Sequence, residues 1–130
     1  MFLDRILNAG SVAVVGASKV KTKRGFQTIR TLLEDGYTGR IYPVNPKETE
    51  ILDLKCYRKV SDIDATVDLA LVATPARLVP AVLEECGKKG VRGAVILAAG
   101  FGETGSEGKD LENRMVSVAR KHGIRPVSYT

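Results

Sequence analysis

Short apolar runs alternate along this chain with longer segments in which apolar residues recur every three or four positions. The longer segments, at residues 25–34, 79–86 and 111–122, have the periodicity of amphipathic helices. Runs without polar alternation are typical of strands buried on both faces of a parallel sheet. The runs lie at residues 12–15, 40–44, 68–73, 93–98 and 124–127. The alternation predicts an α/β fold, a doubly wound parallel sheet of about five strands, for which we expect the strand order 3-2-1-4-5.

The length and composition are those of one folded unit. The chain has 130 residues, of which 44% are hydrophobic and 27% charged. A chain of this size buries roughly two thirds of the surface that its unfolded form exposes. We therefore expect residues 1–130 to form a single domain. Residues 51–64 carry no helical stripe, and we expect them to form an irregular extended connection.

The net charge of +5 limits the classes of ligand. Proteins that bind nucleic acid usually stack its bases on aromatic side chains. This chain has no Trp, and its three Phe and four Tyr are scattered instead of interleaved with basic residues. A small polyanion explains the charge as well, so we expect no nucleic acid as a partner.

The cysteines and the start of the chain indicate the compartment. Cys56 and Cys86 lie in different predicted elements, with no Cys-x-x-Cys spacing and no neighbouring histidine, which predicts packed, reduced thiols and no metal site. The first seven residues are too few and too charged for the apolar part of a signal peptide, and no apolar run approaches membrane-spanning length. We expect a cytoplasmic protein that binds no membrane.

A sheet of this kind places its ligand crevice beyond the carboxyl ends of the strands, near the point where the strand order reverses. In this chain, four short segments follow the ends of the first four predicted strands. They are residues 16–18, 45–47, 74–76 and 99–101. We expect these segments to meet at one edge of the sheet, beside the first strand.

The loop between the first strand and the first helix is rich in cations. A phosphate at such a place meets backbone N–H groups and the positive end of the helix dipole, an interaction of about 0.3 to 1 kcal/mol near a surface. The loop has neither the glycine spacing of the dinucleotide fingerprint nor that of the P-loop. The simpler interpretation is a solvated loop whose lysines favour solubility. The candidate ligand contacts in it are Gly16, Ala17, Ser18, Lys19, Lys21, Lys23, Arg24 and Gly25.

The end of the second predicted strand discriminates between nucleotides. A dinucleotide-binding domain normally carries an Asp or Glu there, which hydrogen-bonds a ribose hydroxyl. This chain carries Asn45, Pro46 and Lys47 instead, and Lys47 would attract a phosphorylated ribose that a carboxylate would repel. The segment therefore disfavours NAD and favours coenzyme A (CoA) or NADP, with Val44 as a further candidate contact. The alternative is a plain turn, which explains the Asn-Pro pair but not Lys47.

Two later strand ends complete the predicted site. Thr74, Pro75 and Ala76 form a small corner with few N–H groups, past which a thin extended chain can run, although a Pro is also good backbone chemistry for starting a helix. Ala99, Gly100 and Phe101 open a glycine-rich turn, which either lets a ligand approach the backbone or is only a flexible connection.

No catalytic residue can be assigned from the sequence. A nucleophile needs a base beside it, and this chain has one histidine and no Gly-x-Ser-x-Gly elbow. That histidine, His122, lies in the last turn of a predicted helix on or near its apolar face, where packing or compensation of the helix-end charge explains it. We expect the chain to perform no chemistry unaided.

Four strand-end pieces, taken in order, carry a family resemblance. They are Val14-Val15-Gly16-Ala17-Ser18 with Gly25, Ile41-Tyr42-Pro43-Val44-Asn45-Pro46-Lys47, Val72-Ala73-Thr74-Pro75-Ala76, and Ala99-Gly100-Phe101-Gly102-Glu103 with Gly105 and Gly108. They resemble the CoA-binding domain of the NDP-forming acyl-CoA synthetases, of which acetate-CoA ligase (ADP-forming) is the best-known member and the succinyl-CoA synthetase α subunits are more distant relatives. The resemblance covers nearly the whole chain.

The resemblance implies a Rossmann-like domain that holds CoA. Ser18, the basic loop and Lys47 would lie near the phosphates, and the corners at 74–76 and 100–101 would line the pantetheine arm. In the family, a histidine from a following domain relays phosphate, and a Gly-Pro-Asn segment follows the fifth strand. This chain does not contain the domain that carries that histidine. In place of the Gly-Pro-Asn segment, residues 127–130 read Val-Ser-Tyr-Thr.

The leading hypothesis is therefore a CoA-binding domain, inactive alone, of an acid-thiol ligase that couples thioester formation to ATP or GTP. The resemblance implies ligase-CoA and ATP-grasp domains or subunits as partners, and the Ala-Gly-Phe-Gly-Glu turn favours such a fragment over a stand-alone CoA-binding protein. Two hypotheses from different functional classes stay open. One is an NADP-binding oxidoreductase fragment, which Lys47 permits and the first loop disfavours, and the second is a regulatory module that uses the fold without a ligand.

Overall fold

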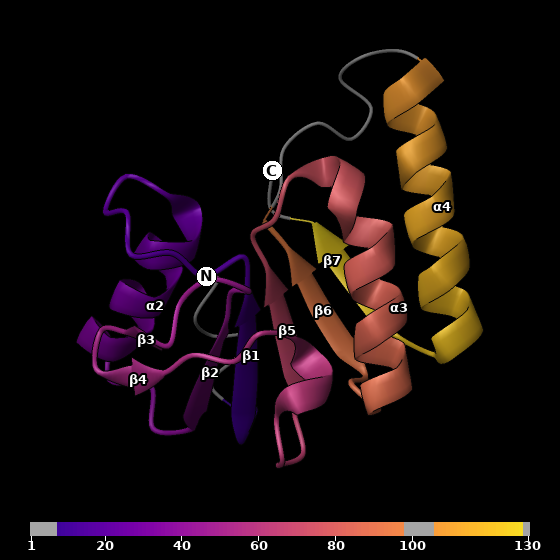
Figure 1. Cartoon of the computed structure of the whole chain (residues 1–130). Coiled ribbons are helices and arrows are strands. Elements are labelled where there is room, and N and C mark those ends of the chain that lie inside the picture. Colours follow the sequence, from indigo (N-terminus) through magenta and orange to yellow (C-terminus); the bar gives the residue numbers. More distant parts are fainter. Residues whose placement is uncertain (1–7, 98–105, 129–130) are drawn as a thin grey trace.

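The computed structural model describes residues 8–97 and 106–128. Their main feature is a parallel sheet whose strands follow the apolar runs of the sequence (Figure 1). The strands are β1 (Ser11–Val15), β2 (Arg40–Val44), β5 (Leu69–Val72), β6 (Gly93–Ile96) and β7 (Arg125–Ser128). The helices are α2 (Arg24–Glu34), α3 (Val79–Lys89) and α4 (Ser106–His122). The predicted α/β class with a doubly wound sheet is confirmed.

The order of strands in this sheet is β2-β1-β5-β6-β7, with every neighbouring pair parallel. The expected order 3-2-1-4-5 is wrong in one respect, because the third strand, β5, lies beside β1 and not outside β2. Pro43 gives the physical reason. Proline has no N–H to donate to a second neighbour, so a strand that contains it lies at a sheet edge. Pro43 therefore fits the edge position that β2 occupies and not the interior position that we expected.

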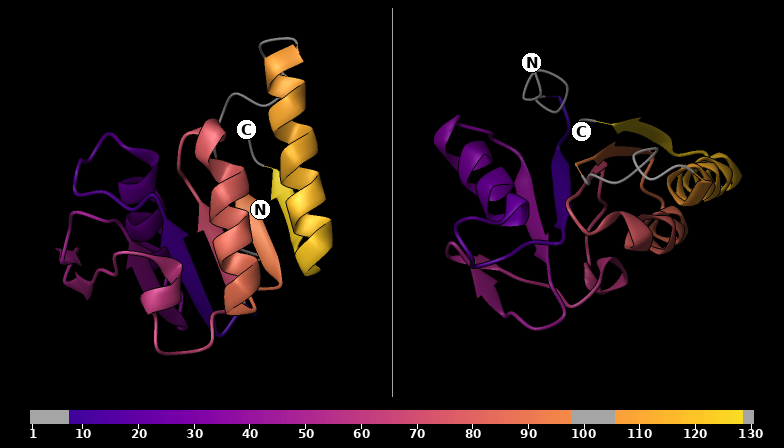
Figure 2. Two further views of the ribbon diagram at one scale, coloured as in Figure 1. Left: turned by 45° about the vertical axis from the view of Figure 1, so that its right-hand side comes forward. Right: turned by 90° about the horizontal axis from the view of Figure 1, so that it is seen from above.

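Both faces of the sheet are covered, and successive strand residues point to opposite sides. Val12 and Val14 of β1 pack in the cluster that includes Ile29 and Leu32 of α2. Ala13 and Val15 pack in the other cluster, with side chains from α3 and α4. Helices α3 and α4 lie side by side (Figures 1 and 2). This two-sided burial is the reason that the strands are apolar almost without interruption.

The connection from β2 to β5 contains no α-helix, as predicted for residues 51–64. It is more regular than expected, because β3 (Glu50–Ile51) and β4 (Leu54–Lys55) form a small antiparallel hairpin. A single 3₁₀ turn follows at Val60–Asp62. Val60 and Ile63 are buried against the sheet on the side of α3. The connection thus lies against the domain along its length instead of forming a free loop.

His122 is a packing residue, as expected. Its imidazole lies against Gly87 of α3, where a Cβ atom would overlap the ring. The Nε2 atom of His122 is 2.7 Å from Oε2 of Glu84, and Nζ of Lys121 is 3.2 Å from Oε1 of the same carboxylate. These contacts join the C-terminal turn of α4 to α3.

The contacts of Glu84 predict an acid-sensitive contribution to stability. The hydrogen bond with His122, and then that with Lys121, hold the pKa of the Glu84 carboxyl below its ordinary value of 4.5. A carboxyl with a lowered pKa stabilises the fold above its unfolded-state pKa, and this contribution is lost as the pH falls through the folded-state pKa. Glu84→Gln should lower the melting temperature at pH 7, and the deficit should vanish as the pH is lowered below 4.5.

Thermal unfolding of both proteins across this pH range measures the effect. Glu112→Gln, at an exposed position of α4, is the matched control and should leave the pH profile unchanged. A deficit in Glu84→Gln that stays constant down to the acid end of the range would contradict the assignment.

Cys56 and Cys86 are free and buried. Burial raises the pKa of the Cys86 thiol to about 12, so this sulfur stays protonated at neutral pH. Within residues 8–97 and 106–128, no helix has both the length and the apolar character needed to cross a membrane. Over the same residues, His, Cys, Asp and Glu side chains form no group that could hold a metal ion.

Candidate ligand-binding site

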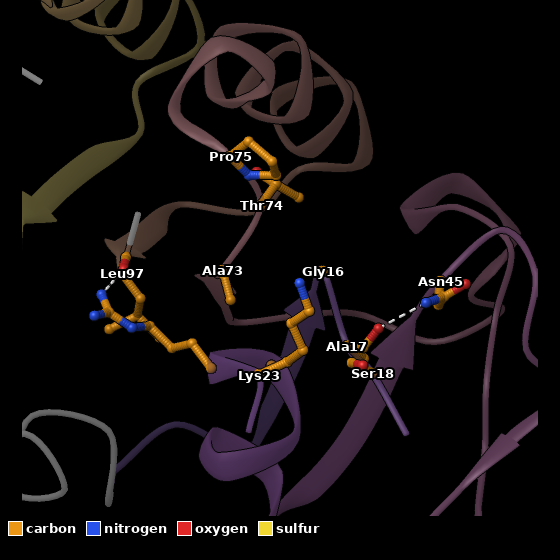
Figure 3. A pocket seen from close by; sticks show the side chains of 11 residues that line it. Gly16, Ala17, Ser18, Lys23, Asn45, Ala73, Thr74, Pro75 and Leu97 are labelled. Carbon is orange, nitrogen blue, oxygen red and sulfur yellow. Dashed lines mark hydrogen bonds between the residues drawn. The ribbon is translucent and has the colours of Figure 1, made fainter. Parts of the chain in front are cut away.

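A pocket of about 470 Å³ opens at the carboxyl edge of the sheet (Figure 3). It lies where β1 and β5 end side by side, which is the switch point in the observed strand order, because the chain leaves β1 toward β2 and later returns to its other side. The lining residues are Gly16, Ala17, Ser18, Lys23, Arg24, Gly25, Asn45, Ala73, Thr74, Pro75 and Leu97. Most of these residues belong to the predicted strand-end segments. Ala73 and Leu97 are additions.

Two glycines allow the walls of this pocket to meet. Gly16 has φ +88°, and a Cβ there would lie 2.8 Å from the backbone of Ala73 and of Thr74. At Gly25, a Cβ would overlap the carbonyl oxygen of Gly16. Helix α2 can therefore begin directly against the end of β1 only because both positions lack side chains. The glycines fit the predicted site as spacers between backbone segments.

The N-terminus of α2 faces the pocket and is electropositive. The first N–H groups of a helix have no partner within it, and in the described part of the chain no side chain caps those of α2, whose first turn has no acidic residue. In Figure 3 the amine of Lys23 extends into the pocket. The guanidinium of Arg24 donates a hydrogen bond to the carbonyl oxygen of Leu97 across it. Open N–H groups, the helix dipole and two cations together make this end of the pocket suited to an anion.

Asn45 holds the neighbouring loops together. Its Nδ2 donates to the carbonyl oxygen of Ala17 at 2.7 Å, and its Oδ1 accepts the backbone N–H of Lys47 at 2.7 Å. The turn that we weighed as the alternative for Asn45-Pro46-Lys47 is therefore present. This turn orders the segment beside the pocket and leaves the side chain of Lys47 exposed.

Several predicted contacts lie away from the pocket walls. Lys19 and Lys21 are exposed on the loop, and Nζ of Lys19 is 4.0 Å from Oε1 of Glu48. Ala76 opens a 3₁₀ turn, Ala76–Leu78, that leads into α3. The predicted contacts Ala99, Gly100 and Phe101 lie outside the described ranges.

A second, smaller pocket of about 220 Å³ adjoins the first. The two share Gly16, Asn45 and Thr74, so they lie on either side of the same strand ends. The remaining lining residues are Val15, Val44, Pro46, Arg58, Lys59, Val82 and Glu85. Val44 and Pro46 were predicted, whereas Arg58 and Lys59 were not. Their only sequence signal is a pair of adjacent cations in a segment that gave no periodic pattern.

Thr74 lines both pockets and has an unsatisfied polar atom. Its Oγ1 atom is buried and has no hydrogen-bond partner among the described residues. A buried hydroxyl without a partner is unfavourable by about 1 to 3 kcal/mol. A polar group of a ligand at the junction of the two pockets would satisfy it.

The fold and the site define a class. A doubly wound sheet that presents a basic pocket and an open helix N-terminus at its switch point is a nucleotide-binding α/β domain. Comparison with known families then identifies the particular family: a model described as a CoA binding domain matches residues 10–129, and the chain belongs to that family. The ligand that the family binds, CoA, is the one expected from the resemblance.

Curated relatives of the chain are longer enzymes. The chain is 50% identical over 115 residues to acetate–CoA ligase [ADP-forming] II of Archaeoglobus fulgidus, a match that covers 88% of this chain and 17% of that protein. It is 47% identical over 129 residues to acetate–CoA ligase [ADP-forming] I subunit alpha of Pyrococcus furiosus, a match that covers 96% of this chain and 28% of that subunit. The chain therefore spans less than a third of these relatives.

Solved structures that resemble the chain include a long synthetase and a shorter protein. A dinucleotide-forming acetyl-coenzyme A synthetase 1 of Ca. Korarchaeum cryptofilum, in complex with phosphate and ADP, superimposes with a TM-score of 0.88 at 44% identity, over 95% of this chain and 26% of that one. A hypothetical protein from Pyrococcus horikoshii OT3 superimposes with a TM-score of 0.75 at 26% identity, over 98% of this chain and 82% of that one. The fold thus occurs both within long synthetases and as most of a short protein.

Proposed function

We propose that this chain is the CoA-holding part of an ADP-forming acyl-CoA synthetase, and that residues 1–130 act as one domain. The observation that carries the proposal is the basic pocket at the uncapped N-terminus of α2, placed at the switch point of the sheet. CoA carries a diphosphate, and two negative charges in series match a site of open N–H groups flanked by Lys23 and Arg24.

The two pockets suggest a path for the ligand. The diphosphate lies against Gly16, Ser18 and the first turn of α2, in the larger pocket. The pantetheine arm leaves toward Thr74 and Pro75, whose corner offers little backbone polarity and enough room for a thin chain. The adenosine end lies on the other side of Asn45, in the smaller pocket.

The chemical steps of the synthetase belong to other parts of the enzyme in this proposal. The relatives in Archaeoglobus and Pyrococcus are named as ADP-forming ligases, and this chain matches only part of each. The chain positions CoA, and ligase and ATP-grasp domains or subunits activate the acyl group. Mixed with acetate, ATP and CoA, the chain alone should release no ADP.

A stand-alone CoA-binding protein is the second candidate. The hypothetical protein from Pyrococcus horikoshii, of which this chain covers 82%, favours it, because in that protein the fold makes up most of the chain. Both candidates bind CoA and differ in whether a partner supplies the chemistry. Addition of a matching synthetase partner subunit separates them: acyl-CoA formation that requires both chains supports the synthetase.

Calorimetric titration tests CoA binding itself. The chain should bind CoA more tightly than dephospho-CoA by at least about tenfold, because a charge-assisted contact to the ribose phosphate is worth about 1.5 to 3 kcal/mol. Higher salt should weaken binding of both, since the cations that line the site are exposed. NADPH is the comparison ligand. Binding of NADPH without any binding of CoA would replace the proposal with an NADP-binding function.

A further inference from the structure

Two cations that the sequence pattern did not single out lie beside the end of β2. Tyr57 forms a parallel bridge with Val44, in which its N–H donates to the carbonyl oxygen of Pro43 at 2.9 Å and its carbonyl oxygen accepts the N–H of Asn45 at 2.8 Å. The chain therefore continues alongside the end of β2 after Tyr57. As a result, Arg58 and Lys59 enter the same pocket as Asn45 and Pro46.

The balance of charge in the smaller pocket is positive. Its single carboxylate, Glu85, accepts the backbone N–H of Val60 through Oε1 at 2.5 Å, which holds that side chain against the protein. Arg58 and Lys59 are exposed, and neither forms an ion pair within the described part of the chain. The other walls, which include Val15, are largely apolar. An apolar cavity with two cations at its mouth suits a base or sugar that carries a phosphate.

The smaller pocket shares part of its wall with the larger pocket at the N-terminus of α2. The shared residues include Thr74, whose buried Oγ1 has no hydrogen-bond partner among residues 8–97 and 106–128. Each pocket has a pair of cations in its wall. Lys23 and Arg24 line the larger pocket, and Arg58 and Lys59 line the smaller one. Two separate pairs of cations suit a ligand with two anionic groups joined by a sugar.

We infer that Arg58 and Lys59 recognise the phosphate on the adenosine ribose of CoA. The inference rests on the proposed function and deepens it, since it assigns the preference for CoA over dephospho-CoA to these two side chains. Lys47, two residues beyond Asn45, lies outside both pocket walls. Its exposed amine contributes less to this preference than the Arg58–Lys59 pair.

The test measures the preference, defined as the Kd for dephospho-CoA divided by the Kd for CoA, in the full chain and three variants. The double variant Arg58→Ala/Lys59→Ala removes the proposed contact. Lys88→Ala/Arg92→Ala removes the same charge from exposed positions near the C-terminal end of α3 and is the matched control. Lys47→Ala tests the competing cation. Adenosine 3′,5′-bisphosphate and 5′-AMP repeat the comparison without the pantetheine arm, and thermal unfolding verifies that each variant is folded.

In the Arg58→Ala/Lys59→Ala variant, the preference should fall from about tenfold or more to about threefold or less, with the Kd for dephospho-CoA unchanged within about twofold. The control should keep the full preference. A folded double variant that keeps the preference, or that weakens both ligands equally, would overturn the inference, as would loss of the preference in Lys47→Ala alone. Each of those results leaves the proposed function standing, because the unaltered chain still binds CoA. Failure of the unaltered chain to bind CoA would instead remove the proposed function.

Discussion

Gly25→Ala should lower the free energy of unfolding by about 3 kcal/mol and the melting temperature by about 10 °C. The added Cβ would overlap the carbonyl oxygen of Gly16 and approach Cα of Ala17, and both are backbone atoms that cannot rotate away. The first turn of α2 would have to move off the end of β1. Because that turn also forms the wall of the larger pocket, CoA binding should be lost together with stability.

Gly93→Ala is the matched control for this substitution. A Cβ at Gly93 would lie 3.0 Å from Cδ1 of Leu69, the far end of a flexible side chain that can shift. Gly93→Ala should lower the free energy of unfolding by about 1 kcal/mol or less. Urea and thermal unfolding of the two variants measure the difference. Equal stability of Gly25→Ala and Gly93→Ala would show that α2 does not depend on close contact with β1.

Lys23→Glu should weaken CoA binding by about 30-fold or more. The substitution replaces a cation that lines the larger pocket with an anion at the N-cap of α2. The new carboxylate can accept hydrogen bonds from the open N–H groups of the helix and so compete directly with the phosphates of the ligand. Stability should not fall, because a negative charge at a helix N-terminus is favourable.

Arg92→Glu, which makes the same change in net charge just before β6 at the opposite end of the sheet, is the control. It should weaken binding only slightly, and only at low salt, through the general field of the protein. Titration with CoA at two salt concentrations measures both variants. An equal loss of affinity in the two variants would mean that net charge, and not the α2 site, attracts the ligand.

The local pattern of the sequence identified most of the larger pocket. A basic loop placed between a buried strand and a helix predicted the anion site, because the position of the loop follows from the alternation of elements alone. Of the residues predicted to contact the ligand, Ser18, Lys23 and Arg24 line the pocket. Lys19 and Lys21 belong to the same loop but do not line the pocket, since its wall is formed by the two ends of the loop, residues 16–18 and 23–25, and the middle of the loop is exposed.

The role of Asn45 required the tertiary structure. In the sequence it stood in the place of a ribose-binding carboxylate, with a plain turn as the alternative. The structure shows both a turn to Lys47 and a hydrogen bond to Ala17, a residue 28 positions earlier in the chain. No local pattern predicts a contact at that separation.

The sequence by itself determined the class of fold and the family, because the buried strands, the helical stripes and the strand-end segments are local and each reflects the burial of its own backbone. Only the tertiary structure decided the strand order and the membership of the smaller pocket. The strand order depends on whether β5 pairs with the free edge of β1 or with that of β2, where Pro43 has no N–H to donate. Arg58 and Lys59 join the site because Tyr57 pairs with the end of β2, on the side away from β1. These are pairings between distant segments, whose free energy arises only when the chain has folded.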